Sequence, residues 1–411
     1  MRIPVVLVER REKGERSLLH ELKELAEAAG YEVAAVLTQV RPPDPRFNLG
    51  AGKVKELANL IRRTGARKVI FYNELKPHQA YNLMKELGVE VTDRFYLILE
   101  IFAQRAGSRE AKLQIELAKL RRDLSFIREW LRLAKMGELH GFMGGGEYAI
   151  DAYYKHVRRR ISRIEEELTE MRARKGLRWR VRAEERGLYY VALAGYTGAG
   201  KTTLFNRLTG YQGYVDGRPF ATLSTKTRKA FLKGRPLIIS DTVGFIDCLP
   251  PTLLDAFYTT LGELLFADLI LLIFDISEPM DEVARKLAAS LSTLDSLGVS
   301  RSRVVAVANK VDLLKRDELK EKLKLVAGMG LDPTPISALR GIGLEELASR
   351  VISSLPGYAV REIKVDGNKR VLKQIYENAY VREVRIEDGS LVLVVEGKAE
   401  WLEAIARKCA A

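Results

Sequence analysis

The chain has 411 residues, 47% of them hydrophobic, and a net charge of +14. This length is enough for about two to four domains with their own cores, and the apolar content excludes a disordered chain. Two cysteines and four histidines exclude a disulfide framework and a cysteine- or histidine-rich metal site, and they favour a reducing, cytoplasmic compartment. The longest apolar stretch, residues 269–276, is far shorter than the ~20 residues of a membrane span, so we expect none.

Residues 1–104 alternate β-rich and helical patterns. Strands are predicted over residues 3–8, 31–40 and 68–72, and helices over residues 15–29, 53–63 and 77–87. Such alternation is typical of βαβ units, whose strands form a parallel sheet. We therefore predict a small parallel βαβ N-terminal domain.

Residues 105–187 show two apolar stripes at helical spacing instead. The first runs from Leu113 to Leu131, the second from Tyr154 to Met171, and the glycine-rich segment 137–146 separates them. Because consecutive glycines are unfavourable in a helix, the pattern predicts an antiparallel helical hairpin with a glycine-rich tip. The polar stretch that follows the second stripe, residues 172–187, is predicted to be a linker.

The hairpin also carries most of the positive charge. In residues 105–186, Lys and Arg outnumber Asp and Glu by 8, which is more than half of the net charge of +14. A basic excess of this kind indicates an anionic partner, and we expect this segment to face nucleic acid. The alternative is a solvated, charged helical face without a partner.

The remaining chain alternates strand and helix again. Buried strands are predicted over residues 189–194, 237–240, 269–274, 304–308 and 334–336, with helices between several of them. This pattern predicts a doubly wound α/β domain over residues 188–356. Residues 357–411 are predicted to form a small α+β C-terminal domain, with strands over residues 360–365, 381–386 and 391–395 and two helices.

A phosphate-binding motif opens the third domain. The segment from Gly195 to Thr202 fits the pattern G-x-x-x-x-G-K-[ST] and lies between a predicted strand and a predicted helix, as a P-loop requires. Its backbone N–H groups should surround phosphate oxygens, while Lys201 reaches the β- and γ-phosphates and Thr202 binds Mg²⁺. The nucleotide-binding residues predicted here are Gly195, Tyr196, Thr197, Gly198, Ala199, Gly200, Lys201, Thr202 and Thr203.

Two residues of a second motif, Asp241-Thr-Val-Gly244, are expected beside the phosphates. The motif follows a predicted strand, where the Asp241 carboxylate can hold Mg²⁺ through water and the Gly244 N–H can contact the γ-phosphate. Between the P-loop and Asp241 we expect a switch threonine that also binds the metal. Thr222 is preferred over Thr225 and Thr227. The predicted catalytic residues are thus Lys201, Thr222 and Gly244, and the predicted metal ligands are Thr202, Thr222 and Asp241.

Two further motifs favour guanine over adenine. Asn309-Lys310-Val-Asp312 follows a predicted strand, and its carboxylate can accept N1–H and N2–H of guanine, a pair of donors that adenine lacks. Ser337-Ala338 follows a later strand and can offer a backbone N–H to the guanine O6. Each motif is short, but all of them occur in order at the ends of strands, so we expect GTP rather than ATP.

The position after Gly244 is also informative. Many small GTPases have glutamine there, which orients the attacking water, but this chain has Phe245, which cannot polarise water. We therefore expect slow unassisted hydrolysis and a partner that completes the site.

These segments resemble the HflX family of GTPases. The resemblance rests on VALAGYTGAGKTTLFNRLTG, PFATLSTKTR, DTVGFIDCLPP and ISALRGIGLEEL in the third domain, and on FNLGAGKVKEL and TDRFYLILEIFAQRAGSREAKLQIELAKL in the N-terminal half. It covers residues 45–355, and the C-terminal unit is similar in kind to that of longer family members. The resemblance implies a GTPase, stimulated by ribosomes, that binds the large ribosomal subunit and its rRNA through residues 105–186 and splits or rescues stalled ribosomes.

The chain also departs from the family pattern. The P-loop has Gly198 where the family often has the asparagine associated with potassium, and the hairpin tip at residues 143–147 is shorter and lacks the usual arginine and proline. ATP binding near the N-terminus is attributed to some members, and Gly50-Ala-Gly-Lys53 is the candidate here. This short segment lacks the full P-loop spacing, so a loop turning into a helix is favoured over an ATP site.

Two other functions are compatible with the sequence. The first is a ribosome-assembly or RNA-remodelling factor in which GTP gates binding without splitting subunits. The second is a signalling GTPase with a protein effector, against which the basic hairpin argues.

Overall fold

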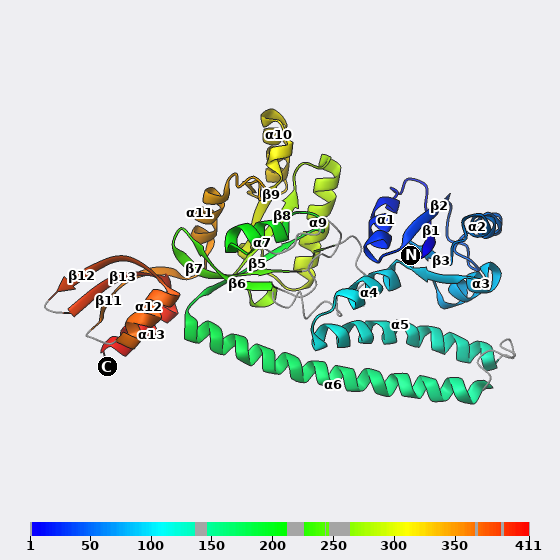
Figure 1. The fold of residues 1–411 in the computed structure, drawn as a ribbon, viewed down its shortest axis with the longest axis horizontal. Coiled ribbons are helices and arrows are strands. Elements are labelled where there is room, and N and C mark those ends of the chain that lie inside the picture. Colours follow the sequence, from blue (N-terminus) through cyan, green and yellow to red (C-terminus); the bar gives the residue numbers. More distant parts are fainter. Residues whose placement is uncertain are drawn as a thin grey trace. The chain divides into compact units, whose positions relative to one another are not determined.

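The computed structural model describes residues 2–135, 146–211, 226–242, 244–245, 264–365, 369–387 and 390–410 (Figure 1). Described residues up to Met171 form one compact unit, and those from Arg172 onward form a second. The predicted mixed α/β fold class is confirmed, and the domain boundaries stay a prediction. None of the helices described is both long enough and apolar enough to cross a membrane.

The first unit begins with a four-stranded parallel sheet in the order β2-β1-β3-β4. Its strands are β1 (Pro4–Arg11), β2 (Glu32–Val40), β3 (Lys68–Phe71) and β4 (Glu90–Asp93), and its helices are α1 (Leu19–Ala28), α2 (Ala51–Thr64), α3 (Pro77–Leu87) and α4 (Arg94–Arg105). Residues 5–8 of the central strand β1 are all fully buried, as expected for a parallel strand with both faces covered. The predicted βαβ layer is confirmed, and the pattern had missed β4 and α4.

Helix α1 begins four residues later than predicted. Glu9, two residues before the end of β1, accepts hydrogen bonds from Ser17 Oγ and Leu18 N, each at 2.6 Å. This carboxylate holds the chain just before the helix in a non-helical turn, so the helix begins only at Leu19.

Two long helices, α5 (Arg109–Lys135) and α6 (Gly146–Arg186), follow. The apolar stripes predicted from the sequence pack against each other in two clusters, for example Leu117 with Ile164, and Ile127 with Val157. Ion pairs join Arg109 to Glu167 and Glu116 to Arg160, so a later position on α5 meets an earlier position on α6, as in an antiparallel pair. The antiparallel hairpin is confirmed, while tip residues 136–145 lie outside the described chain.

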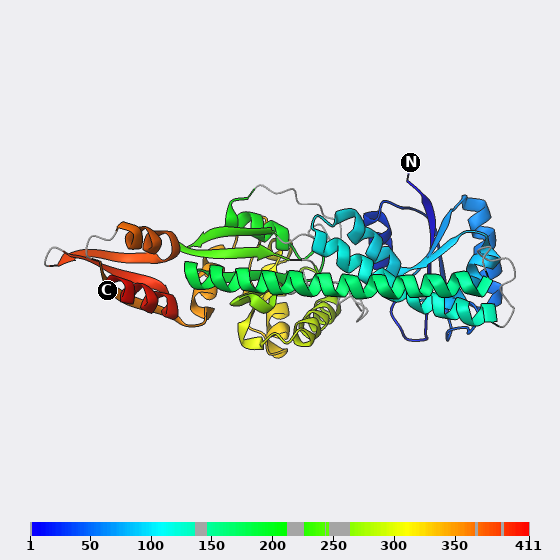
Figure 2. The same ribbon diagram turned by 90° about the horizontal axis from the view of Figure 1, so that it is seen from below.

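The predicted linker over residues 172–187 is wrong. The backbone of residues 172–186 is helical and continues α6, which Figure 2 shows as a single helix. The stretch is rich in Arg, Glu and Ala, which have high helix propensity, and it contains no proline. Helix α6 ends where Gly187 takes a positive φ of 60°.

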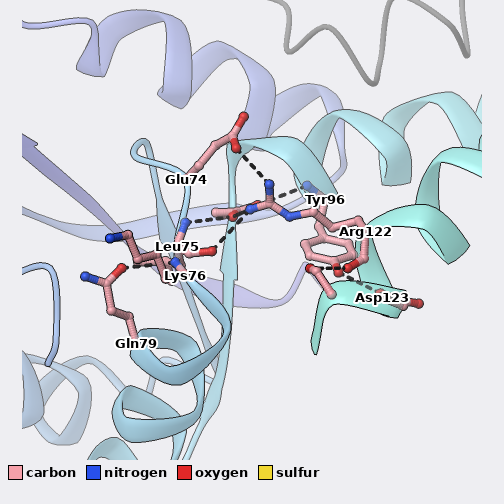
Figure 3. Close-up of polar contacts among 9 residues, drawn as sticks. Glu74, Leu75, Lys76, Gln79, Tyr96, Arg122 and Asp123 are labelled. Atoms are coloured by element: carbon pink, nitrogen blue, oxygen red, sulfur yellow. Dashed lines mark hydrogen bonds and ion pairs between the residues drawn. The ribbon is translucent and has the colours of Figure 1, made fainter. Parts of the chain in front are cut away.

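Helix α5 is fixed to the N-terminal sheet through Arg122 (Figure 3). Its guanidinium donates to Asp93 Oδ2 at 2.8 Å, to Glu74 Oε2 at 2.7 Å and to the Leu75 carbonyl at 3.3 Å. The Asp93 side chain is only 2% exposed, and burial raises the pKa of its carboxyl group while Arg122 opposes that rise. This buried contact joins the hairpin and the sheet within one unit.

The second unit contains a six-stranded sheet in the order β10-β9-β8-β5-β7-β6. Its strands are β5 (Tyr189–Gly195), β6 (Lys226–Leu232), β7 (Arg235–Asp241), β8 (Leu269–Asp275), β9 (Val304–Asn309) and β10 (Thr334–Pro335). All pairs are parallel except β6 with β7, so the doubly wound domain is confirmed with one antiparallel edge strand. The described helices are α7 (Lys201–Thr209), α9 (Met280–Ser296), α10 (Arg316–Gly328) and α11 (Leu344–Ser354), with short 3₁₀ turns η1 (Arg301–Arg303) and η2 (Val311–Leu313).

The end of the chain forms a three-stranded antiparallel sheet in the order β11-β13-β12. It consists of β11 (Tyr358–Val365), β12 (Tyr380–Glu387) and β13 (Ser390–Lys398), with α12 (Lys369–Asn378) and α13 (Ala399–Ala410) packed on one face. Arg235 at the start of β7 donates to the buried Glu396 of β13 at 2.5 Å, and Lys398 donates to Asp268 at 2.9 Å. These contacts hold the small α+β domain to the six-stranded sheet.

Candidate functional site

The predicted P-loop connects the buried strand β5 to helix α7. Gly195, Gly198 and Gly200 all have positive φ values, of 140°, 79° and 95°. A Cβ atom at Gly195 would lie 2.0 Å from the Ile273 carbonyl oxygen, and one at Gly200 would lie 2.2 Å from Asn309 Nδ2. Only glycine fits these two positions, so the backbone can curl tightly at the N-terminus of α7, where an anion is favoured.

Lys201 is the first residue of α7, and its side chain lies inside this loop. Its ammonium donates to the carbonyl oxygens of Gly195 at 2.9 Å and Tyr196 at 2.8 Å. Burial lowers the pKa of Lys201 to about 8, although Asp241 acts in the opposite direction. A phosphate at the loop would therefore stabilise the charged form of this lysine.

The predicted metal ligands that the structure describes lie together. Thr202 Oγ1, in the first turn of α7, donates to Asp241 Oδ2 at the end of β7 at 2.9 Å. Asp241 is fully buried, and Thr203 follows Thr202 in the same turn. A carboxylate and a hydroxyl at the phosphate loop are oxygen donors of the kind that Mg²⁺ prefers, so this pair fits the metal. Thr222 and Thr225 lie outside the described residues.

The segment after Asp241 lies against the P-loop. Phe245 N donates to the Gly195 carbonyl at 2.9 Å, and Thr197 N donates to the Phe245 carbonyl at 2.8 Å. A Cβ atom at Gly244 would lie 2.8 Å from Thr197 Cγ2 and 3.0 Å from Lys201 Nζ. Gly244 thus lies next to Lys201, and its contact with a γ-phosphate stays a prediction. The Phe245 ring is buried and offers no polar atom to water.

The predicted base-binding residues meet at the same edge of the sheet. Asn309 Nδ2 donates to the Ala199 carbonyl of the P-loop at 2.7 Å, and Asn309 Oδ1 accepts from Ala338 N at 3.0 Å. One amide side chain therefore connects the P-loop with the Ser337-Ala338 loop. Ser337 is fully buried and accepts from Arg340 N, which shapes that loop.

Lys310 and Asp312 occupy the turn after β9. Lys310 has a positive φ of 69°, unusual for a residue other than glycine, and Asp312 is exposed in η2. The exposed carboxylate is accessible to a ligand at the surface of the site.

Sequence reasoning did not single out Arg207, which also shapes the site. From α7 its guanidinium donates to the Leu339 carbonyl at 2.8 Å and to the Ala338 carbonyl at 3.4 Å. These contacts join residues more than 130 positions apart, so no local pattern could have predicted them.

The Gly50–Lys53 segment lies in the other unit. Gly50 N donates to Gln39 Oε1 at 2.9 Å, α2 begins at the next residue, and Lys53 pairs with Glu56 at 2.8 Å. This is the geometry of a loop turning into a helix, which the sequence favoured, and ATP binding here stays a prediction.

Comparisons with known proteins identify the family of this chain. Three family models match successive regions: "GTP-binding GTPase N-terminal" over residues 16–103, "GTP-binding GTPase Middle Region" over 105–182 and "50S ribosome-binding GTPase" over 190–310. A GTPase HflX from Thermofilum pendens is 54% identical over 392 residues, covering 94% of this chain and 92% of that protein. The chain belongs to the HflX family of GTPases.

Other relatives agree with this assignment. A GTPase HflX from Methanocaldococcus jannaschii is 36% identical over 396 residues, covering 96% of each chain. A crystal structure described as a complex of SsGBP and GDP is 30% identical, with a TM-score of 0.53, and the alignment covers 86% of this chain and 98% of that one. The chain is therefore a GTP-binding GTPase, as the sequence predicted.

Proposed function

We propose that this HflX-family GTPase binds the large ribosomal subunit and splits or rescues stalled ribosomes, with GTP controlling the binding. The observation that carries the proposal is the match of residues 190–310 to a family model described as a 50S ribosome-binding GTPase. A basic helical hairpin in the same chain supports it, because rRNA is a polyanion.

The hairpin residues differ in their availability for RNA. Arg158 and Arg159 of α6 are exposed, whereas Arg160 makes two hydrogen bonds to Glu116 of α5, at 2.7 and 2.8 Å. Arg160 is thus already paired with a carboxylate of the other helix. We assign the contact with rRNA phosphates to Arg158 and Arg159; a merely solvated charged face is the competing interpretation.

In the proposed nucleotide site, different residues bind the phosphates, the metal ion and the base. The P-loop backbone and Lys201 bind the β- and γ-phosphates, and the Gly244 N–H contacts the γ-phosphate. Thr202, Asp241 and Thr222 would hold Mg²⁺, which supplies positive charge against the phosphate oxygens when bound. Asp312 would accept the guanine N1–H and N2–H. The Ala338 N–H, which donates to Asn309 Oδ1 in the structure, would be shared with guanine O6 or transferred to it.

Hydrolysis by the isolated protein should be slow. Phe245 stands where a water-orienting glutamine is common, and its ring is buried. A group from the ribosome would orient the water, so ribosomes should stimulate turnover. Fast turnover by the purified protein alone would contradict this part of the proposal.

Co-sedimentation with separated ribosomal subunits tests the partner. We expect pelleting with the large subunit in the presence of GTP or a non-hydrolysable analogue, and less with GDP. Failure to pellet with the large subunit in any nucleotide state would refute the proposal and favour the signalling GTPase. Light scattering of intact ribosomes then separates splitting from the binding expected of an assembly or remodelling factor.

The double variant Arg158→Gln, Arg159→Gln tests the surface. Its binding should weaken, and the slope of log K against log salt should fall by about 2, one unit for each phosphate contact. A matched control, Lys320→Gln with Lys324→Gln, removes two exposed charges from α10 and should bind normally. Equal binding by the two double variants would show that the charge on α6 is only a solvated surface.

A further inference from the structure

A short loop between β8 and α9 contacts the turn that carries the guanine-reading residues. Asp275, the last residue of β8, accepts from Lys310 Nζ with one carboxylate oxygen, Oδ2, at 2.6 Å. Its other oxygen, Oδ1, accepts from Ser277 N at 3.0 Å and from Ser277 Oγ at 2.5 Å. The Asp275 side chain is 10% exposed and the Lys310 side chain 35%, so this ion pair is partly shielded from solvent.

The turn that Asp275 contacts contains a residue in an unfavourable backbone conformation. Lys310 has a φ of 69°, a left-handed conformation that costs a residue with a Cβ atom about 1–3 kcal/mol. Such a residue persists only when its surroundings hold it there. Asp275 holds the Lys310 side chain, and Ile276 N of the same loop donates to the Asn309 carbonyl at 3.1 Å. The direction in which the chain leaves Lys310 decides where Asp312, two residues later, lies.

The loop is anchored from its other side by a buried lysine. The ammonium of Lys322, on α10, donates to the carbonyl oxygens of Ile276 at 3.1 Å and Glu278 at 2.9 Å, with Ser277 O at 3.4 Å. Glu318 lies 3.2 Å away on the same helix. Burying a lysine is unfavourable unless its charge is satisfied, so convergence of these carbonyls on one ammonium indicates that it fixes the loop.

We propose that Asp275 is a positioning residue for guanine recognition: it holds the left-handed turn at Lys310 and thereby orients the Asp312 carboxylate, while Lys322 fixes the loop that carries it. The inference rests on the proposed assignment of Asp312 to the base. The side-chain contacts described for Asp275 are with Lys310 and Ser277 and not with the predicted metal ligands, so its effect should fall on base recognition and not on the chemical step.

The variant Asp275→Asn tests the positioning role. Asparagine has nearly the same size, but its amide cannot accept from Lys310 on one side and from Ser277 on the other. Titration with fluorescent GDP should show an affinity about tenfold lower, the size expected for losing one charge-assisted hydrogen bond. The base of IDP lacks the exocyclic amine whose N–H Asp312 accepts, so the affinity for IDP should fall less than the affinity for GDP. The value of kcat at saturating GTP should stay within about twofold of wild type.

The matched control is Asp295→Asn. Asp295 forms an exposed ion pair with Arg301 at 2.6 Å in the same domain, and its loss should leave GDP affinity unchanged. Equal GDP affinity in the two variants would overturn the proposal. So would an equal loss of GDP and IDP affinity, since that is the signature of a merely structural role.

A second variant changes Lys322, which contacts the loop between β8 and α9 from α10, and it leaves Asp275 unchanged. Lys322→Met keeps an unbranched side chain but removes the ammonium, so the Ile276, Ser277 and Glu278 carbonyls lose this donor and the loop loses its anchor. We expect GDP affinity to fall at least threefold relative to Lys320→Met on the exposed side of α10. Unchanged affinity would overturn the role of the loop. If the wild-type chain did not bind GDP, the nucleotide site itself would be refuted, which is a different outcome.

Discussion

Replacing Arg122 by methionine should destabilise the first unit by about 3–5 kcal/mol, the cost of removing one partner from a buried ion pair. The guanidinium reaches Asp93, Glu74 and a backbone carbonyl within 3.3 Å, and it lies 4.8 Å from the centre of the Phe95 ring. In the variant, the Asp93 carboxylate would stay buried and keep only its backbone donors, Leu75 N at 3.0 Å and Tyr96 N at 3.3 Å.

The neighbouring residue provides a control for this change. Arg121 pairs with Glu165 at 2.8 Å, but the two side chains are 36% and 44% exposed, so Arg121→Met should cost only about 0–1 kcal/mol. Hydrogen exchange of the β3 and β4 amides in the full chain measures both variants without dissecting the protein. Equal protection in the two variants would refute the argument that burial decides the cost.

The same substitution has a pH signature. Burial already raises the pKa of Asp93, and removing Arg122 removes a charge that lowers it, so the folded-state pKa rises further. When the pKa of an acid is higher in the folded state than in the unfolded state, ionisation of that acid lowers the free energy of unfolding as pH rises. At a pH low enough to protonate the acid in both states, this destabilisation is absent. The deficit of Arg122→Met should therefore shrink as pH falls from neutral, and a deficit independent of pH would contradict the assignment to Asp93.

Three further predictions concern the nucleotide site. Burial lowers the pKa of Lys201 to about 8 in the free protein, and a bound phosphate favours the charged lysine. The affinity for GDP should therefore be independent of pH just below pH 8. Above it, affinity should fall up to about tenfold per pH unit, measured by titration, and a flat profile to pH 10 would contradict a role for the ammonium. Gly200→Ala should abolish nucleotide binding, since its Cβ would lie 2.2 Å from Asn309 Nδ2, whereas Gly52→Ala, in open space, should leave binding intact. Asp312→Asn should shift preference from guanine towards xanthine nucleotides, and unchanged GTP affinity would refute the base-reading assignment.

The parts of this molecule that sequence predicts well are those encoded locally. The P-loop is one continuous segment whose glycines and lysine have the spacing that phosphate binding requires, and the central strands are runs of apolar residues that only burial explains. The edge strand β6 was missed because its sequence, KTRKAFL, is mostly polar and its pairing comes from β7. The short strand β4 was missed for a related reason, since four residues carry too little pattern.

Other features depend on contacts between distant residues. The polar stretch 172–186 resembles a linker by composition, and only the structure shows that it continues the helix begun at Gly146. Asp275 and Lys322 lie outside every motif of the sequence, because their partners are a turn and a loop that the fold brings to them. Sequence therefore names candidate residues for nucleotide contact, and it missed the residues that the structure packs around them.

Strand β7 has different neighbours at its two ends. At one end Asp241 accepts a hydrogen bond from Thr202 of α7, and at the other Arg235 donates to Glu396 of the C-terminal sheet. Seven residues of extended chain span about 20 Å and resist both stretching and compression, because each is hydrogen-bonded to β5 or β6. Strand β7 thus connects the predicted nucleotide site to the C-terminal sheet, so a shift of the strand along its axis at Asp241 would also move Arg235, which holds the last domain.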